Sequence, residues 1–345
     1  MPPKFKKMNL ALDDFPEEEN PFMENSMTCV FGPEGLKFVK ENFEVKKTGI
    51  TNTSTGEGQQ LSVDDLEIGP MIGRGSSGIV QRAVIKGTGV AVAIKSINAY
   101  DKDKRKQLLN DIRALDTAKC PFLVRYYGGF FQDGHVKIAL EFMDRGSLKS
   151  LLESVIHSKT IIPENVLARM TLQIIHGLIY LHRITHQIHR DIKPDNILMS
   201  SNGSVKLTDF GISRELPTTQ THCETFCGTA TYMSPERISG KKYSYPSDIW
   251  SLGLVILELA IQKYPYPRPT IYLEVAEFVL NSDEPRLPED SGYSLELANF
   301  IECCIKRAPE ERATAIQLAA HPWIIKNCYN EDVNVTGWID SLKKK

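Results

Sequence analysis

Alternating apolar and polar positions dominate one part of the chain, and a helical period dominates the part that follows. Between residues 66 and 142 apolar residues recur mostly at every second position, as in half-buried β-strands. Residues 80–97 alternate on both sides of a Gly87-Thr88-Gly89 run, which predicts a β-hairpin. A helix is predicted over residues 102–118, because its apolar residues fall on one helical face: Leu108, Leu109, Ile112 and Leu115.

Helical patterns take over from residue 146 onward. The strongest run over residues 163–183, with Pro163 near the first turn, and over residues 248–261. A strand-rich part followed by a helix-rich part predicts an α+β fold of two lobes with a cleft between them.

The N-terminal region has a weaker pattern. Residues 13–25 are acidic and contain two prolines, which predicts a flexible link. Short apolar alternations at residues 28–47 predict one or two strands, and the Thr- and Gly-rich stretch 48–60 is typical of a linker. We therefore expect the compact domain to begin near Leu66, after an N-terminal extension and linker over residues 13–65.

Composition and charge narrow the class of protein. The chain has 345 residues, is 41% hydrophobic and 24% charged, and carries a net charge of −2, so no global field favours nucleic acid or an anionic membrane. No stretch approaches the ~18 apolar residues of a membrane span. The N-terminus lacks the apolar core of a signal peptide, and Pro2 excludes N-myristoylation. The seven cysteines are odd in number and form no CxxC pair, which indicates free thiols in a reducing compartment. We expect a cytoplasmic protein with no nucleic-acid partner and no membrane span.

Two groups of potential metal ligands have simpler interpretations. Cys223 and Cys227 lie near His222, but their spacing matches no common zinc pattern. His182 and His186 fall on one helical face, yet a helix that runs into a catalytic loop explains them better, because the nearby His189 belongs to a stronger motif.

A glycine-rich loop occupies residues 72–80. Its G-x-G-x-x-G pattern is weak alone, because dinucleotide-binding folds share it and a structural turn without ligand remains an alternative. A strand hairpin rather than a helix follows this loop, so its backbone N–H groups would cover phosphates as a lid. The glycines of the pattern are Gly73, Gly75 and Gly78.

The run VAIK places Lys95 at the end of an apolar strand. Such a lysine normally extends its ammonium to solvent. In the functional interpretation the ammonium binds the α- and β-phosphates of a nucleotide. Val80 and Ala93 would then pack over the adenine ring.

The strongest pattern is HRDIKPDN at residues 189–196, followed by DFG at 209–211. Asp191 can accept the proton of an attacking hydroxyl, and Lys193 can neutralise charge on the transferring phosphoryl group. Asn196 and Asp209 supply oxygen ligands suited to Mg²⁺. Any one of these triplets can arise by chance. All four motifs in this order indicate ATP-dependent phosphoryl transfer.

With these motifs the chain resembles eukaryotic protein kinases over residues 66–325. The resemblance implies an N-lobe at 66–143, a C-lobe at 144–325, and a C-terminal tail at 326–345. It also implies an adenine pocket with Leu140 as gatekeeper, a hinge at residues 141–143, and Leu198 as the residue that closes the bottom of the pocket. The remaining expected adenine-site residues are Ile72, Glu141 and Met143.

The same resemblance assigns structural roles in the C-lobe. Glu236, in an SPE triplet where most kinases have APE, would pair with Arg312. Asp248 would brace the catalytic loop. Lys193 is typical of kinases that accept serine or threonine.

One position departs from the kinase pattern. The family pairs the strand lysine with a glutamate on the small-lobe helix, and here that position is Asp111. Aspartate is shorter by one methylene, so either the helix approaches more closely or a water bridges. The alternatives are a tolerated replacement and a weakened active state, and we favour the first because the other catalytic residues are present.

Residues 228–254 resemble the corresponding segment of MAP kinase kinases, including the SPE variant. Thr225 directly precedes Phe226 and matches an activating phosphorylation site of that family. Its partner is either Thr221, at the spacing of animal members, or Thr219, at the spacing of plant members. Phosphate there would pair with Arg190 and order the loop, although loop threonines are often merely solvated.

The first twelve residues resemble the docking motif with which MAP kinase kinases bind their substrate. A basic cluster would meet an acidic patch, and two apolar residues would enter a groove. The residues of this motif are Lys4, Lys6, Lys7, Leu10 and Leu12. Residues 32–43 and the LSVDDLEIGP run also resemble the N-terminal extension of plant-type members.

The resemblance implies a dual-specificity MAP kinase kinase that uses ATP and Mg²⁺. Its partners would be a downstream MAP kinase, modified on threonine and tyrosine, and an upstream MAP kinase kinase kinase. Two alternatives remain: another Ser/Thr kinase of the same broad group, and a kinase-fold scaffold without turnover. Only Asp111 favours the scaffold.

Overall fold

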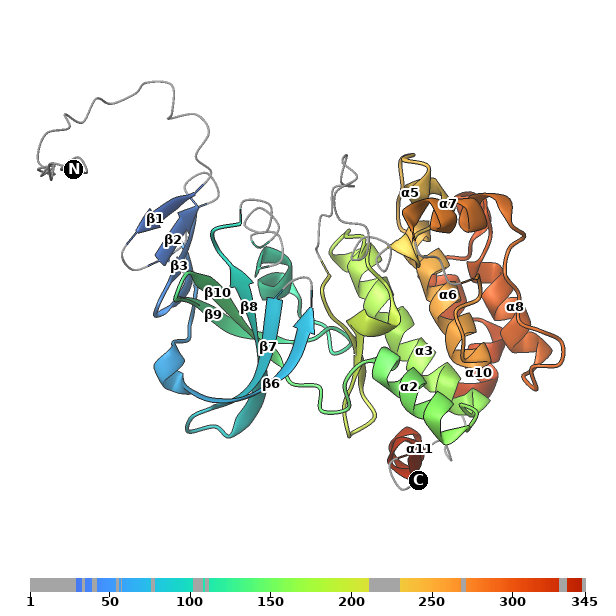
Figure 1. The fold of residues 1–345 in the computed structure, drawn as a ribbon, viewed down its shortest axis with the longest axis horizontal. Coiled ribbons are helices and arrows are strands. Elements are labelled where there is room, and N and C mark those ends of the chain that lie inside the picture. The colour runs from blue at the N-terminus through green and yellow to red at the C-terminus, as the bar shows by residue number, and fades with distance from the viewer. Residues whose placement is uncertain are drawn as a thin grey trace, which may run out of the picture.

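A computed structural model describes residues 29–32, 35–38, 42–53, 56, 58–75, 78–101, 108, 112–210, 230–267, 271–328 and 334–342. Strands gather in one lobe and most helices in the other (Figure 1). The predicted α+β arrangement of two lobes is therefore confirmed.

The strand lobe is built on an antiparallel sheet in the order β6-β7-β8-β10-β9. Its strands are β6 (Leu66–Gly75), β7 (Gly78–Ile85), β8 (Val90–Asn98), β9 (Tyr126–Gln132) and β10 (His135–Glu141). The predicted hairpin is the β7–β8 pair, which turns between Ile85 and Val90. Val92, Ile94 and Ile97 of β8 are buried, as is Lys95, so burial alternates only in the first part of the strand. Within the predicted helix 102–118, the described residues 108 and 112–117 are helical.

A second antiparallel sheet comes before β6 in the sequence, with the strand order β1-β2-β3-β4-β5. It comprises β1 (Val30–Gly32), β2 (Gly35–Phe38), β3 (Phe43–Lys46), β4 (Gly49–Asn52) and β5 (Gly58–Gln60). The prediction of one or two strands at residues 28–47 is too low, because β1, β2 and β3 lie there, and the prediction of a linker at residues 48–60 is wrong, because β4 and β5 lie there. The glycines of this stretch allow close strand pairing. A Cβ on Gly49 would lie 2.5 Å from the carbonyl oxygen of Gln59.

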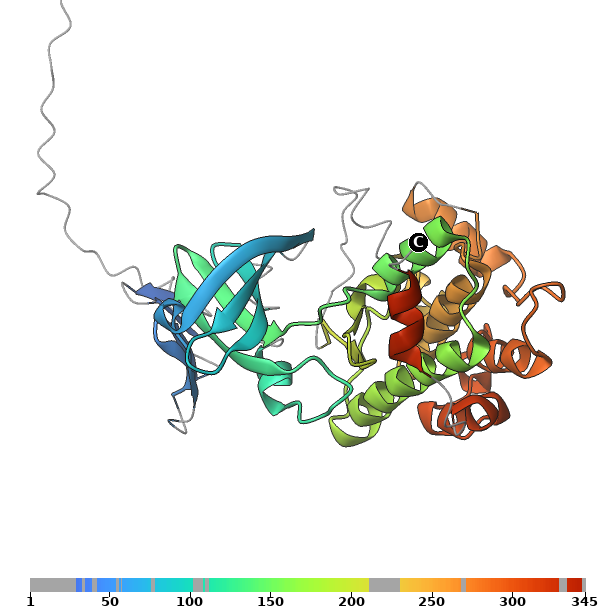
Figure 2. The same cartoon turned by 90° about the horizontal axis from the view of Figure 1, so that it is seen from below.

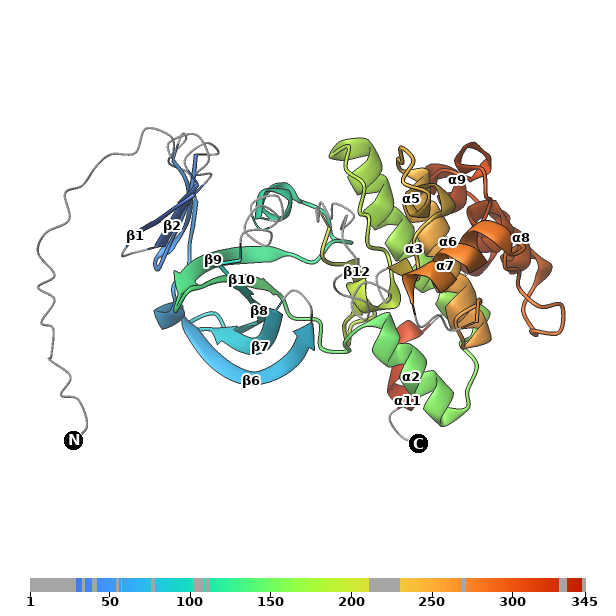
Figure 3. The ribbon, with the colours of Figure 1, turned by 45° about the horizontal axis from the view of Figure 1, so that its top comes forward.

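Figure 3 shows this N-terminal sheet against the strand lobe, next to β9. Its inward residues are almost fully buried, including Leu36 at 0% and Phe38 at 1% exposure. They belong to the same buried cluster as Leu108 and Ile112 of the small-lobe helix. The N-terminal sheet is thus continuous with the core of the domain.

The helical lobe surrounds α6 (Pro246–Ile261), which is buried along nearly its whole length. A helix that is apolar on all sides belongs in the centre of a lobe. Both strong helix predictions are confirmed. The helix predicted at residues 163–183 is α3 (Glu164–Ile179), which continues into a wider helical turn at Tyr180–Ile184, and the helix predicted at residues 248–261 lies within α6. The other helices are α2 (Leu148–Ser158), α5 (Pro235–Ile238), α7 (Tyr272–Asn281), α8 (Leu295–Cys304), α9 (Ala315–Ala319) and α10 (Pro322–Cys328).

A further helix, α11 (Val335–Leu342), lies within the predicted C-terminal tail. It packs beside α2, as Figure 2 shows, with Val335 and Ile339 buried. Asp340 forms an ion pair with Arg145, which follows the hinge. Among the helices of the described residues, none has the length and apolar character needed to cross a bilayer.

Candidate active site

Asp248, in the first turn of α6, fixes the backbone of the catalytic loop through hydrogen bonds. Its carboxylate accepts backbone hydrogen bonds from His189 at 2.8 Å and Arg190 at 2.9 Å. His182 Nε2 lies 2.8 Å from the same carboxylate. Burial alone would raise the pKa of Asp248, but the contacts with His182 and the backbone lower it below its ordinary value. Asp248 therefore braces the loop as an anion, which is the role that the kinase resemblance implied.

His182 and His189, near this loop, have structural contacts within the protein. His182 is hydrogen-bonded to Asp248, and His189 is fully buried. Among the described residues, no group of three or more His, Cys, Asp and Glu side chains could hold a metal ion. The interpretation of His182 as the end of a helix that enters the loop agrees with this geometry.

Two predicted catalytic residues, Asp191 and Lys193, and the predicted metal ligand Asn196 meet around one carboxylate. Asn196 Nδ2 donates to Asp191 Oδ2 at 2.9 Å and to the Asp191 carbonyl at 2.8 Å. Lys193 Nζ lies 3.0 Å from the same Oδ2. Asp191 is only 6% exposed, so these contacts fix its direction.

Lys95 and Asp209 connect the two lobes. Lys95 Nζ lies 2.7 Å from Asp209 Oδ1, which joins β8 to the DFG run. Burial would raise the pKa of Asp209, but the Lys95 ammonium outweighs burial and lowers that pKa below its ordinary value. Asp209 is therefore an anion held next to the ammonium of Lys95.

Two residues of this site have a positive backbone φ angle. Asp209 has φ of 58° and Arg190 has φ of 72°, values that residues other than glycine rarely adopt. Such conformations persist where surrounding contacts fix them, often at functional sites. Here the hydrogen bond from Arg190 to Asp248 and the pair of Asp209 with Lys95 supply those contacts.

The sheet register brings the predicted adenine-site residues of the strands together. Val80 lies opposite Gly73 on β6 and opposite Lys95 on β8. Ala93 lies opposite Leu140 on β10. Gly75 and Gly78 face each other at the turn between β6 and β7.

The other predicted adenine-site residues come from the cleft edges. Ile72 is 46% exposed on β6, and Leu198 is half-buried on the short strand β11 (Ile197–Met199), which pairs with β12 (Val205–Leu207). Met143 and the gatekeeper position Leu140 are buried. Apolar residues from both lobes are thus available to the two faces of a flat ring.

One hinge contact was not predicted. Both carboxylate oxygens of Glu141 bind Lys206 Nζ, at 2.8 and 2.7 Å. The backbone N–H of Arg125 also donates to Glu141, at 3.2 Å. The side chain of Glu141 is therefore engaged within the protein, and its backbone N–H donates to the carbonyl oxygen of Arg125 at 2.8 Å. Lys206 lies 65 positions away in sequence, so no local pattern indicates this pair.

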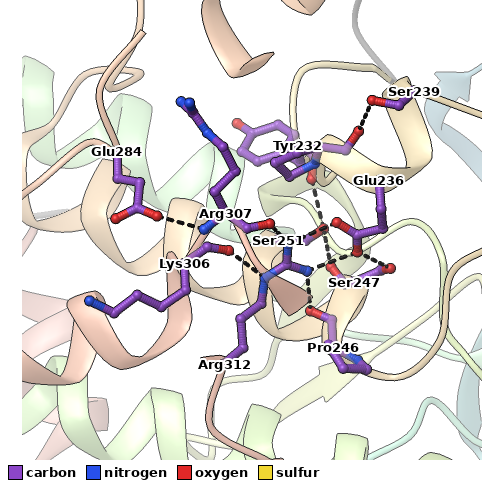
Figure 4. Close-up of polar contacts among 11 residues, drawn as sticks. Tyr232, Glu236, Ser239, Pro246, Ser247, Ser251, Glu284, Lys306, Arg307 and Arg312 are labelled. Atoms are coloured by element: carbon purple, nitrogen blue, oxygen red, sulfur yellow. Dashed lines mark hydrogen bonds and ion pairs between the residues drawn. The ribbon is translucent and has the colours of Figure 1, made fainter. Parts of the chain in front are cut away.

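The expected pair of Glu236 and Arg312 forms in the C-lobe (Figure 4). Both guanidinium Nη atoms lie 2.8 Å from the carboxylate oxygens. The remaining N–H donors reach backbone carbonyls of Lys306, Pro246 and Arg307. All donors of a fully buried guanidinium are thus satisfied.

Acidification should weaken this pair. Burial raises the pKa of Glu236, but Arg312 and Ser247 overcome it and lower the value to about 2. A lowered pKa contributes stability above the unfolded pKa of about 4.5, and that contribution is lost as pH falls toward about 2. We expect Glu236→Gln to flatten the pH dependence of the free energy of unfolding between these values, measured by urea titration. An unchanged pH profile would contradict this assignment.

Several predicted residues lie outside the described part of the chain. They include the ion-pair position on the small-lobe helix, the glycine of the DFG run, the candidate phosphorylation sites and the docking motif. These residues are Asp111, Gly211, Thr219, Thr221, Thr225, Lys4, Lys6, Lys7, Leu10 and Leu12.

Comparisons with known proteins agree with this geometry. The model of the protein kinase domain matches residues 66–324. Mitogen-activated protein kinase kinase 2 of Arabidopsis thaliana is 42% identical over 79% of this chain and 75% of its own length. Mitogen-activated protein kinase kinase 1 of the same plant is 37% identical over 92% and 93%. Dual specificity mitogen-activated protein kinase kinase dSOR1 of Drosophila melanogaster is 37% identical over 81% and 75%.

Proposed function

This chain belongs to the MAP kinase kinases of the protein kinase family and is an ATP-dependent dual-specificity protein kinase, and from that premise we propose the residues and partners that carry the activity. It transfers the γ-phosphoryl group of ATP to a threonine and a tyrosine in the activation loop of a MAP kinase. The position of the Asp191 carboxylate, fixed by Asn196 and Lys193, is the observation that most directly supports phosphoryl transfer to a hydroxyl.

Asp191 accepts the proton of the substrate hydroxyl as the oxygen attacks the γ-phosphorus. The bond from that phosphorus to the β–γ bridging oxygen breaks, and ADP leaves. Lys193, next to Asp191, reduces negative charge on the transferring group. Lys95 binds the α- and β-phosphates and orients the nucleotide.

Asn196 and Asp209 are suited to hold Mg²⁺. Asn196 donates both hydrogen bonds of its amide nitrogen to Asp191, so its amide oxygen is left to accept a cation. Asp209 supplies an anionic oxygen, and hard oxygen donors are the ligands that Mg²⁺ takes. When bound, the ion would neutralise charge on the β- and γ-phosphates.

The glycine loop Gly73, Gly75 and Gly78 would cover the phosphates. The adenine would lie between the strand lobe and β11. Its ring contacts would come from Ile72, Val80, Ala93, Met143 and Leu198, and its polar contacts from the hinge backbone at Glu141 and Met143.

Regulation would follow from the activation segment. An upstream MAP kinase kinase kinase would phosphorylate Thr225 and either Thr221 or Thr219. The guanidinium of Arg190 would then form an ion pair with one of the phosphothreonines. The odd number of cysteines still favours a cytoplasmic location.

The docking motif gives a test of substrate choice. We expect the combined change Leu10→Ala and Leu12→Ala to slow phosphorylation of a folded MAP kinase by about 10-fold or more, because two buried apolar anchors contribute roughly 1–3 kcal/mol. Phosphorylation of a short generic peptide should stay unchanged. Initial rates on both substrates measure the difference.

The same measurement separates the alternatives. Equal rates on the peptide and the folded MAP kinase would favour another Ser/Thr kinase of this group. Absence of transfer to both, with ATP still bound, would favour a kinase-fold scaffold. Replacing Asp111 by Glu would then test whether the shorter acid causes the loss.

A further inference from the structure

The N-terminal sheet, strands β1–β5, contacts the described part of the small-lobe helix and a residue that precedes it in the sequence. Phe31 of β1 stacks on Tyr100, with ring centroids 5.1 Å apart and planes inclined by 17°. On the helix, the guanidinium of Arg113 lies 5.6 Å from the ring centroid of Phe43 on β3. Gln59 Nε2 of β5 donates to Asp116 Oδ1 at 3.3 Å.

Buried apolar packing joins the same elements. Leu36, Val45 and Ile50 of the sheet are at most 4% exposed, and they share one buried cluster with Ile112 and other helix residues. Burying such side chains stabilises the packing of the sheet through the hydrophobic effect. The sheet is therefore part of the packing of the lobe rather than a loose attachment.

Two glycines of β9 make the close approach possible. A Cβ on Gly129 would lie 2.8 Å from Ile50 Cδ1 of β4. A Cβ on Gly128 would lie 3.5 Å from the Cβ of Gln59 on β5. A side chain at Gly129 would crowd Ile50, so glycine at that position lets β9 and the N-terminal sheet pack closely.

We propose that the N-terminal sheet is a brace that sets the position of the small-lobe helix and thereby the efficiency of phosphoryl transfer. Phe43 and Gln59 are its positioning residues. By the kinase pattern the acid partner of Lys95 is Asp111, which directly precedes Ile112 in the sequence. A shorter acid needs a closer helix, and the contacts of the sheet with Arg113 and Asp116 favour such an approach. This inference rests on the proposed function.

The test compares two matched variants within the full chain. Phe43→Leu keeps an apolar side chain in the buried site but removes the ring that faces Arg113. Lys37→Ala changes an exposed residue of β2 and leaves the inward face of the sheet intact. We expect Phe43→Leu to lower kcat on a folded MAP kinase by about 2- to 30-fold, with little change in KM for that substrate. Lys37→Ala should retain the parent kcat.

Hydrogen exchange gives a second measurement that does not need activity. Phe43→Leu should speed amide exchange at residues 112–117, whereas Lys37→Ala should not. Gln59→Glu, which places a carboxylate opposite Asp116, should act in the same direction as Phe43→Leu. Adding Asp111→Glu to Phe43→Leu should restore part of kcat, since a longer acid tolerates a more distant helix.

The outcomes separate this inference from the proposed function. Unchanged kcat and unchanged exchange in Phe43→Leu, with an active parent protein, would overturn the brace and leave the kinase assignment intact. A parent that transfers no phosphate would count against the function, and exchange at residues 112–117 would then decide the brace alone. A fall in kcat without faster exchange at the helix would also contradict the brace.

Discussion

The Asp191→Asn variant should lose phosphoryl transfer almost entirely, with kcat lower by about 10²–10⁴-fold, which is the usual contribution of a general base. The amide keeps the size of the carboxylate but cannot accept the proton of the substrate hydroxyl. Lys95 and the glycine loop remain, so the Kd for ATP should change little. Single-turnover transfer from labelled ATP and nucleotide binding by calorimetry measure the two quantities.

A neighbouring acid supplies the matched control for this variant. Asp195 is exposed, four positions further along the same loop, and has no role in the proposed chemistry. Asp195→Asn should retain the parent kcat. Comparable losses in both variants would show that any change in the charge of the loop impairs the enzyme, and the role of Asp191 as base would be wrong.

The Arg312→Leu variant should be destabilised by about 3–5 kcal/mol, the usual result of removing one partner of a buried ion pair. Glu236 is only 7% exposed and would keep its charge without the guanidinium that compensates it. The backbone carbonyls that Arg312 now caps would lose their donors as well. Urea titration followed by tryptophan fluorescence measures the free energy of unfolding.

Two further variants distinguish charge burial from loss of packing. Lys326→Leu removes one partner of an exposed pair with Glu296 and should change stability by less than about 1 kcal/mol. The double variant Glu236→Leu, Arg312→Leu removes both charges and should be more stable than Arg312→Leu alone. A double variant less stable than Arg312→Leu would contradict the claim that the unpaired carboxylate causes the loss.

The active centre was predictable because its residues lie in short, ordered motifs. Asp191, Lys193 and Asn196 fall within one loop, and their contacts span at most five positions. Lys95 and Asp209 are distant in sequence, but the motif order of the kinase pattern places them together. The period of apolar residues was sufficient for the β7–β8 hairpin and for α6.

Features that depend on long-range packing were not predictable in the same way. β4 and β5 are short and lie in a stretch rich in Thr and Gly, a composition that linkers share, and they form strands through pairing within the N-terminal sheet. Burial of Ile50 against Gly129 depends on a strand that comes much later in the chain. The pair of Lys206 and Glu141 and the docking of α11 on α2 likewise join segments that no local pattern relates.

The most direct test of the central claim is to identify the residues phosphorylated on a folded, catalytically inactive MAP kinase. The enzyme would carry Thr225→Glu with either Thr221→Glu or Thr219→Glu, and Asp191→Ala would be the control. We expect mass spectrometry to find phosphate on both a threonine and a tyrosine of the activation loop, and none with the control. An enzyme that phosphorylates generic peptides but leaves both loop residues of the folded MAP kinase unmodified would contradict the claim.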